Sequence, residues 1–111
     1  MRMLTEEECR NAMEKGEFDL PSGAKALVLT QSWCPQWKAM RAYLDEAEKS
    51  LSGLEIIYLE YDLASFSEEF MAFKENTFNN REIPYVRYYK DGACINSSNY
   101  VSLEGFLQRL N

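Results

Sequence analysis

The residue with the clearest chemical potential in this sequence is Cys34, which lies between two tryptophans in the stretch QSWCPQW. The apolar run KALVLT before it predicts a buried strand, and Pro35 after it is typical of the first turn of a helix. Unpaired amides at a helix N-terminus favour a thiolate, so this position indicates a reactive thiol. A second cysteine three residues later would complete the motif C-x-x-C, but that position is Trp37.

The missing second thiol limits the redox chemistry that Cys34 can perform. A mixed disulfide on Cys34 cannot be resolved by attack from position 37, which excludes dithiol reduction by this motif. The other thiols are Cys9 and Cys94. Both fall in segments away from the predicted strand-to-helix junction, so we expect neither to reach Cys34. An inert, partly buried Cys34 is the alternative interpretation.

Length and composition narrow the class of protein. The chain has 111 residues, of which 46% are hydrophobic and 14% aromatic, as expected for a single folded domain over 1–111. Its net charge of −6 opposes binding to nucleic acids and to anionic membranes. The absence of histidine excludes Ser-His and Cys-His catalysis and the usual zinc sites. We therefore expect neither a metal nor another cofactor.

The sequence also favours a cytoplasmic location. No apolar stretch approaches the roughly 20 residues needed to cross a bilayer, and the first ten residues lack the apolar segment of a signal peptide. Three scattered cysteines do not form a disulfide framework and fit a reducing compartment. A mature protein whose signal peptide has been removed is the alternative.

The hydrophobic pattern predicts the elements that position Cys34. Thr5 and Glu8 form a capping box for the first helix, and Ser65 or Ser67 can cap the third. The predicted elements are helix 5–16, strand 24–31, helix 35–50, strand 54–62, helix 66–78, two strands within 84–96 joined at an Asp-Gly turn, and helix 102–110. Strands separated by helices run parallel, so we predict an α/β protein with a mixed sheet sandwiched between helices.

Two segments of the chain resemble the thioredoxin family. The WCPQW segment between strand and helix is similar to the family's W-C-x-x-C motif, here as C-x-x-W. The segment IPYVRYYKDG is similar to its isoleucine-proline pair, apolar strand and glycine turn. The resemblance extends from about residue 24 to the C-terminus. It implies a thioredoxin-like fold, a cis peptide bond between Ile83 and Pro84, and packing of Pro84 beside Cys34.

The sequence also departs from that family. The buried acid that thioredoxins carry six residues before the first cysteine is Val28 here, and their nearby strand lysine lines up with Tyr58. The proton-relay pair is therefore missing. Pro35 is similar to the second residue of the glutaredoxin motif C-P-Y-C, but Ile83 stands where glutaredoxins usually have threonine or valine. A basic glutathione clamp is not evident.

The predicted site combines Cys34 as nucleophile with a shallow groove for an extended peptide. The groove residues are expected to be Trp33, Pro35, Trp37, Ile83, Pro84 and Tyr85. Trp33 is expected to be exposed. Trp37 lies on the apolar stripe of its helix, where packing in the core is favoured over contact with a substrate. The predicted function is a thiol redox protein that forms transient mixed disulfides with protein or low-molecular-weight thiols. A redox-inactive binding module is the alternative, and a dimeric iron–sulfur protein with an external thiol ligand is a third.

Overall fold

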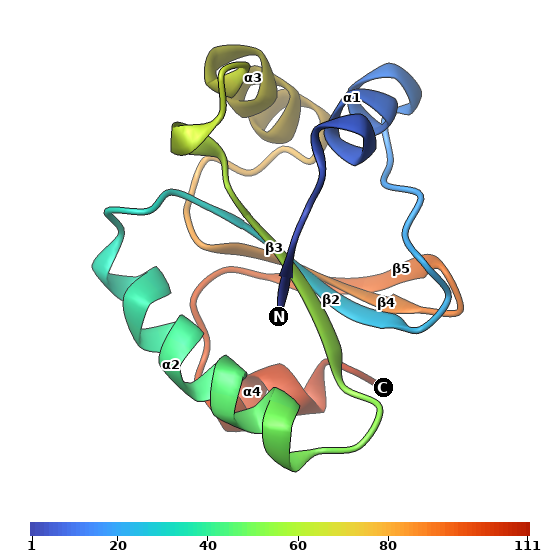
Figure 1. Cartoon of the computed structure of the whole chain (residues 1–111), viewed down its shortest axis with the longest axis vertical. Helices are drawn as coiled ribbons and strands as arrows, with labels where there is room; N and C mark the ends of the chain where they lie inside the picture. The colour runs from blue at the N-terminus through green and yellow to red at the C-terminus, as the bar shows by residue number, and fades with distance from the viewer.

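The computed structural model describes residues 1–111 and confirms the predicted alternation of helices and strands (Figure 1). Two elements are additional, the short strand β1 and the 3-10 helix η1. The elements in chain order are β1 (Arg2–Met3), α1 (Glu6–Lys15), β2 (Ala24–Thr30), α2 (Pro35–Ser50), β3 (Glu55–Glu60), η1 (Tyr61–Leu63), α3 (Ser67–Thr77), β4 (Tyr85–Lys90), β5 (Ala93–Ser98) and α4 (Leu103–Gln108).

The five strands form one mixed sheet in the order β1-β3-β2-β4-β5. β2 runs parallel to β3, while β4 is antiparallel to both β2 and β5. Helices α1 and α3 cover one face of the sheet, and α2 and α4 cover the other (Figure 1). This arrangement confirms the predicted sheet between two layers of helices.

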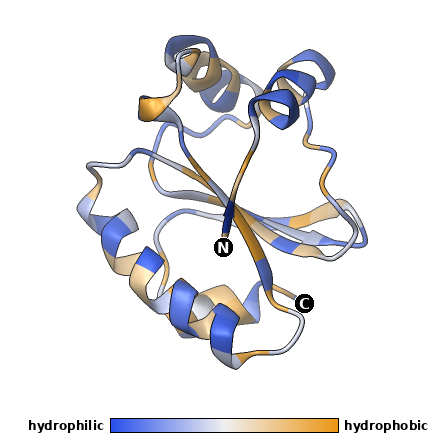
Figure 2. Ribbon diagram, viewed as in Figure 1, coloured by the Kyte–Doolittle hydropathy of each residue, from blue (hydrophilic) through white to orange (hydrophobic).

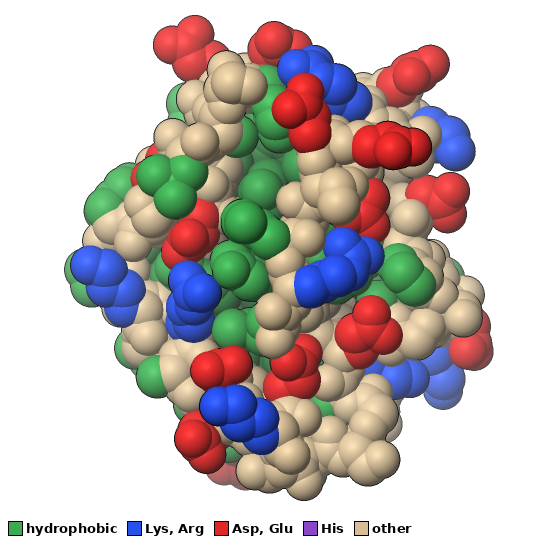
Figure 3. All heavy atoms as spheres, in the orientation of Figure 1, with side chains coloured by type: hydrophobic (Ala, Val, Ile, Leu, Met, Phe, Trp, Pro, Cys, Tyr) green, Lys and Arg blue, Asp and Glu red, His purple; other side chains and the backbone are tan.

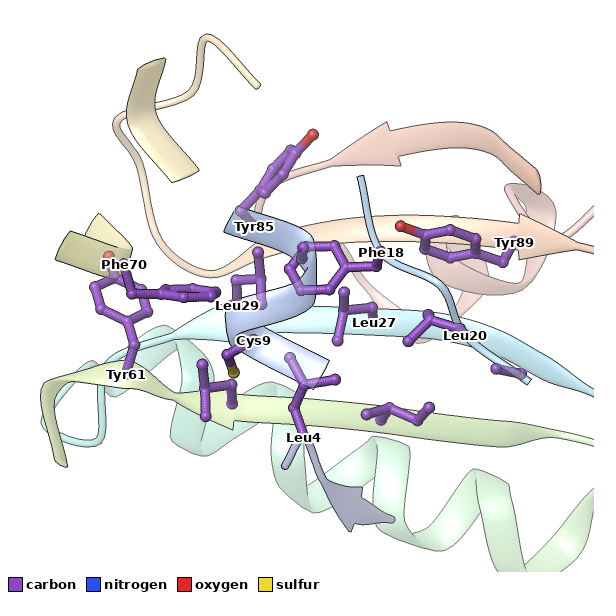
Figure 4. Packing of buried hydrophobic residues seen from close by; sticks show 14 of the residues in the cluster. Leu4, Cys9, Phe18, Leu20, Leu27, Leu29, Tyr61, Phe70, Tyr85 and Tyr89 are labelled. Atoms are coloured by element: carbon purple, nitrogen blue, oxygen red, sulfur yellow. The ribbon is translucent and has the colours of Figure 1, made fainter. Parts of the chain in front are cut away.

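Each face of the sheet has its own apolar core, and β2 contributes to both. Leu27 and Leu29 pack into the core under α1 and α3, shown in Figure 4, whereas Ala26 and Val28 pack into the core under α2 and α4. Side chains alternate along a strand, so a strand buried on both faces must be apolar at nearly every position. This explains the continuous apolar run before Cys34.

Helix α1 begins as its sequence predicts. The Glu8 amide donates to the Thr5 hydroxyl over 3.1 Å, and the Thr5 amide donates to the Glu8 carboxylate over 2.9 Å. The helix ends at Gly16, whose φ of 82° is the left-handed conformation that glycine adopts without strain. The capping box is confirmed.

Helix α3 begins differently, and the predicted serine cap is wrong. Its N-cap residue is Phe66, and no side chain caps the helix. A short connection separates η1 from α3, and the Ser67 amide donates to the carbonyl of Ala64 in that connection over 3.2 Å. A backbone carbonyl therefore takes the part that a serine hydroxyl would have taken.

Charge and hydropathy follow the layers. Figure 2 shows polar and apolar residues alternating around α2, as an amphipathic surface helix requires. Figure 3 shows acidic side chains gathered over the end of the molecule formed by α1 and α3. Both helices carry glutamates in their first turns, where negative charge complements the helix dipole. None of the helices combines the length and the apolar character needed to span a membrane.

Candidate functional site

Cys34 is the N-cap residue of α2, and a short connection joins it to the end of β2. Pro35 occupies the first turn and has no N–H, and the Lys38 amide makes the first helical hydrogen bond, to the Cys34 carbonyl over 3.1 Å. The amides of Gln36 and Trp37 consequently have no partner within the helix. No acidic side chain lies in this first turn. The thiol thus stands at a helix N-terminus, as predicted.

The loop that carries Pro84 lies against the thiol. The Cys34 sulfur is 4.0 Å from the carbonyl oxygen of Ile83, and the Ile83–Pro84 peptide bond is cis. Pro84 is buried, and Ile83 is half-buried. These neighbours leave Cys34 only 4% exposed, so a partner can approach its sulfur only where the surrounding loops give way slightly.

The segment before Cys34 is held by hydrogen bonds to η1. The Ser32 amide and hydroxyl both donate to the Asp62 carboxylate, over 2.7 and 2.6 Å. The Trp33 indole N–H donates to the Gln31 side chain over 2.7 Å. Trp33 is 60% exposed, as expected from its position before the helix.

Trp37 packs in the core, as its place on the apolar stripe favours, so its inclusion among the groove residues is wrong for this structure. The side chain is fully buried, and its indole N–H donates to the Glu60 carboxylate over 2.8 Å. Arg41 pairs with the same carboxylate over 3.2 Å. The apolar stripe of α2 carries Trp37 into the core under that helix, as the spacing of the stripe favours.

The two positions where thioredoxins carry their proton-relay pair are neighbours in the sheet. Val28 on β2 pairs in register with Tyr58 on β3. Val28 is fully buried, and the Tyr58 hydroxyl accepts a hydrogen bond from Arg41 over 3.2 Å. An apolar side chain and a phenol cannot relay protons as a carboxylate and an amine do.

Tyr85 is also misplaced in the predicted groove. It is the first residue of β4, and its side chain packs into the core under α1 and α3, on the face opposite Cys34 (Figure 4). There its hydroxyl accepts a hydrogen bond from Arg87 over 3.0 Å. Because Val86, the next residue along β4, packs on the Cys34 side, Tyr85 must face away.

The other two cysteines lie away from Cys34. Cys9 is fully buried in the core under α1 and α3, where burial raises the pKa of its thiol to about 12. Cys94, on β5, is half-buried, and its thiol donates to the carbonyl of Asn96 over 3.3 Å. All three cysteines are free. No group of three or more His, Cys, Asp or Glu side chains is arranged to hold a metal ion.

Sequence reasoning missed the polar side chains that hold the Pro84 loop. Lys74 is fully buried on α3 and donates to the carbonyl of Glu82 over 2.6 Å, and Asn99 donates to the carbonyl of Pro84 over 3.0 Å. The signal was present in the sequence, because Lys74 lies four residues after Phe70 on the buried stripe of α3. A lysine on an apolar stripe predicts a buried amine, which must find hydrogen-bond acceptors inside the protein.

Solved structures share this architecture along nearly the whole chain. Fasciola hepatica thioredoxin matches with a TM-score of 0.68 and 12% identity, over 99% of this chain and 96% of its own. The chain has a thioredoxin-like fold. Oxidized thioredoxin O1 from Arabidopsis thaliana matches this thioredoxin-like chain with a TM-score of 0.65 and 17% identity, over 96% of this chain and 90% of its own.

A glutaredoxin also shares the thioredoxin-like fold. Buckwheat glutaredoxin, solved as a complex with glutathione, matches with a TM-score of 0.54 and 20% identity, over 85% of this chain and 78% of its own. No family model and no curated protein matches the sequence.

Proposed function

We propose that this thioredoxin-like chain is a thiol redox protein in which Cys34 forms transient mixed disulfides with protein or low-molecular-weight thiols. The observation that carries the proposal is the position of Cys34 at the N-cap of α2, with the Ile83 carbonyl 4.0 Å from its sulfur. A helix N-terminus offers amide dipoles to a thiolate, and the neighbouring loop offers a backbone edge to a partner.

The chemistry proceeds by two thiol–disulfide exchanges. The Cys34 thiolate attacks one sulfur of a partner's disulfide; a new S–S bond forms, and the partner's other sulfur leaves as a thiolate. An external thiolate then attacks the mixed disulfide and releases Cys34. Each step replaces one S–S bond with another, without a net change in oxidation state. The chain therefore needs no cofactor besides the external thiol. The external thiol takes the part that a second cysteine at position 37 would have taken.

A partner would bind where the connection before α2 meets the loop that carries Pro84. Trp33 and Pro35 are exposed beside the thiol, and the half-buried Ile83 provides the backbone edge. An extended segment can pair with such an edge while an apolar side chain rests on the indole of Trp33. With a net charge of −6, the chain disfavours nucleic acids and anionic membranes as partners.

A redox-inactive binding module is the second candidate. The low exposure of Cys34, 4%, favours it, because a thiol enclosed by its neighbours reacts slowly. This candidate uses the same groove and the same partner class, but it makes no covalent bond.

We propose a cytoplasmic location and a single domain. Free Cys9, Cys34 and Cys94 fit a reducing compartment, where thiols stay unpaired. Two cores that share one five-stranded sheet fit one cooperative unit.

Mass spectrometry of the intact protein tests the proposal. The variant Cys9→Ala/Cys94→Ser retains Cys34 alone, and its matched control also carries Cys34→Ser. Incubation with glutathione disulfide should add one glutathione to the first protein and none to the second, and dithiothreitol should reverse the addition. If the folded Cys34-only protein acquires no glutathione and exchanges with no peptide disulfide, the binding module is the better description.

A further inference from the structure

A buried lysine anchors the loop that faces Cys34. The Lys74 amine, fully buried on α3, donates to the carbonyl of Glu82 over 2.6 Å and to the side-chain oxygen of Asn80 over 3.1 Å. The carboxylate of Glu75, the next residue, pairs with Arg81 instead of this amine, which is 5.5 Å from the centre of the Tyr85 ring. The positive charge is therefore held mainly by neutral acceptors of the loop.

Asn99 also binds the loop that carries Pro84. It follows β5, and its side-chain amide donates to the carbonyl of Pro84 over 3.0 Å, with longer contacts of 3.2 Å to Asn80 and 3.3 Å to the carbonyl of Glu82. Asn80 returns a hydrogen bond to the Asn99 side-chain oxygen over 3.0 Å. Lys74, Asn80 and Asn99 thus form one network, here called the loop lock.

The loop lock fixes the carbonyls on both sides of Ile83. The carbonyl of Glu82 accepts from Lys74, and that of Pro84 accepts from Asn99. The carbonyl between them, that of Ile83, is the one that faces the Cys34 sulfur. Fixing the Glu82–Ile83 and Pro84–Tyr85 peptide groups restricts the orientation of the planar Ile83–Pro84 peptide group between them.

We infer that Lys74 and Asn99 are positioning residues of the Cys34 site, holding the Ile83 backbone in the orientation that a partner's extended segment needs. The inference rests on the proposed function of Cys34. It also explains why an amine occupies a core position. An unpaired buried ammonium costs stability, and an apolar side chain would pack there at less cost.

The protonation state of Lys74 does not disrupt the lock. Burial lowers the pKa of Lys74 to about 8, partly offset by the charges of Glu75 and Glu82. The neutral amine still has two N–H donors, one for each of its acceptors. The lock therefore persists on both sides of this pKa.

Two variants in the Cys34-only background test the inference. They should raise the rate of alkylation and lower the rate of exchange with a peptide disulfide relative to glutathione disulfide. Lys74→Met removes the donor at similar volume, and Asn99→Asp replaces the donating amide with a carboxylate oxygen. A loosened loop admits a small reagent more easily but pairs less well with a peptide. Alkylation of Cys34 by iodoacetamide should rise roughly threefold to tenfold, the factor equivalent to one hydrogen bond. Exchange with an extended peptide disulfide, relative to glutathione disulfide, should fall by a similar factor.

Leu4→Ala is the matched control. Leu4 packs beside β1, which β3 and β2 separate from β4, so this change destabilises the fold without touching the loop. General loosening raises the rate of alkylation and the rates of exchange with both disulfides together. The inference is overturned if the folded lock variants react like their parent, or if their rates only rise together as in Leu4→Ala. If one variant fails to fold, the other decides.

The two proposals fail in different ways. A parent protein that exchanges with neither disulfide contradicts the proposed function of Cys34. Alkylation still tests the lock in that case, because a rate that stays unchanged in both lock variants shows that they do not hold the loop against the thiol.

Discussion

The indole N–H of Trp37 donates a 2.8 Å hydrogen bond to the carboxylate of Glu60 inside the fold. Trp37 stands where a C-x-x-C motif would carry its second cysteine, and Arg41 pairs with the same carboxylate. The position of a resolving thiol is therefore filled by a buried aromatic ring with a satisfied polar atom. Any turnover by Cys34 depends on a thiol from another molecule.

The wild-type chain should not accelerate the reduction of insulin disulfides by dithiothreitol, as measured by turbidity. Trp37→Cys supplies a second thiol and should gain activity, though slowly, because Val28 replaces the acid of the proton relay. Removing a buried indole costs about 3–5 kcal/mol, so the assay belongs at low temperature. Trp37→Ser creates the same cavity without a thiol and should stay inactive. Strong wild-type activity would contradict this prediction and show that another thiol, dithiothreitol or Cys94, resolves the mixed disulfide on Cys34 efficiently.

Lys74 should make the stability of the protein rise with pH above about 8. Burial lowers its pKa to about 8, whereas the unfolded chain has the ordinary value, near 10.4. Between these values the unfolded state binds more protons, so the free energy of unfolding increases, by about 3 kcal/mol at most. Urea unfolding at pH 7 and pH 10 measures the change in the free energy of unfolding for the wild type and for Lys74→Met. Tyrosines and cysteines titrate in both proteins, so their contribution cancels when the two changes are subtracted. Equal pH dependence in the two proteins would contradict the prediction.

Glu8 should contribute stability that is lost in acid. The hydrogen bond from Arg2, with those from Thr5, lowers the pKa of Glu8 to about 2 against burial. Its contribution is present above the ordinary pKa of about 4.5 and disappears as the pH falls toward 2. The pair is partly exposed, so Glu8→Gln should cost only about 1 kcal/mol at pH 7. The cost should vanish near pH 2 in urea titrations, and a cost independent of pH would assign it to packing.

Arg87 should matter more for stability than the ion pair it makes. Its buried guanidinium donates to the hydroxyls of Tyr85 and Tyr89, pairs with Glu17, and lies 3.9 Å over the ring of Phe78. Arg87→Leu leaves two buried hydroxyls without this donor and should cost about 2–3 kcal/mol. Glu17→Gln should cost less, because Glu17 stays about half exposed. Equal losses in urea unfolding would show that the ion pair dominates.

Much of the fold could be predicted because its elements are amphipathic and clearly bounded. The Asp-Gly turn between β4 and β5 has positive φ at both residues, 52° at Asp91 and 83° at Gly92, as that dipeptide favours. β1 could not be predicted, because two residues are too few to show a period. It exists because Arg2 pairs in register with Ile57 and binds Glu8.

The candidate site was predicted in position but not in the direction of every side chain. The sequence indicates that Cys34 lies between a strand and a helix, yet its exposure depends on a loop some fifty positions away along the chain. Tyr85 was misassigned because the face of a strand residue depends on where pairing begins, and a shift of one residue reverses it. Trp37 lies near the motif, which indicates a groove contact, and on an apolar stripe, which indicates a core position. The structure places it in the core.

The sheet also acts as a partition between sulfur atoms. Cys9 packs on one face and Cys34 on the other, with the strands between them. The native chain therefore cannot store an oxidising equivalent as an internal bond between these two thiols, and whatever Cys34 accepts must pass to another molecule. A Cys9–Cys34 crosslink recovered from a cell extract would be a record of unfolding, not of signalling.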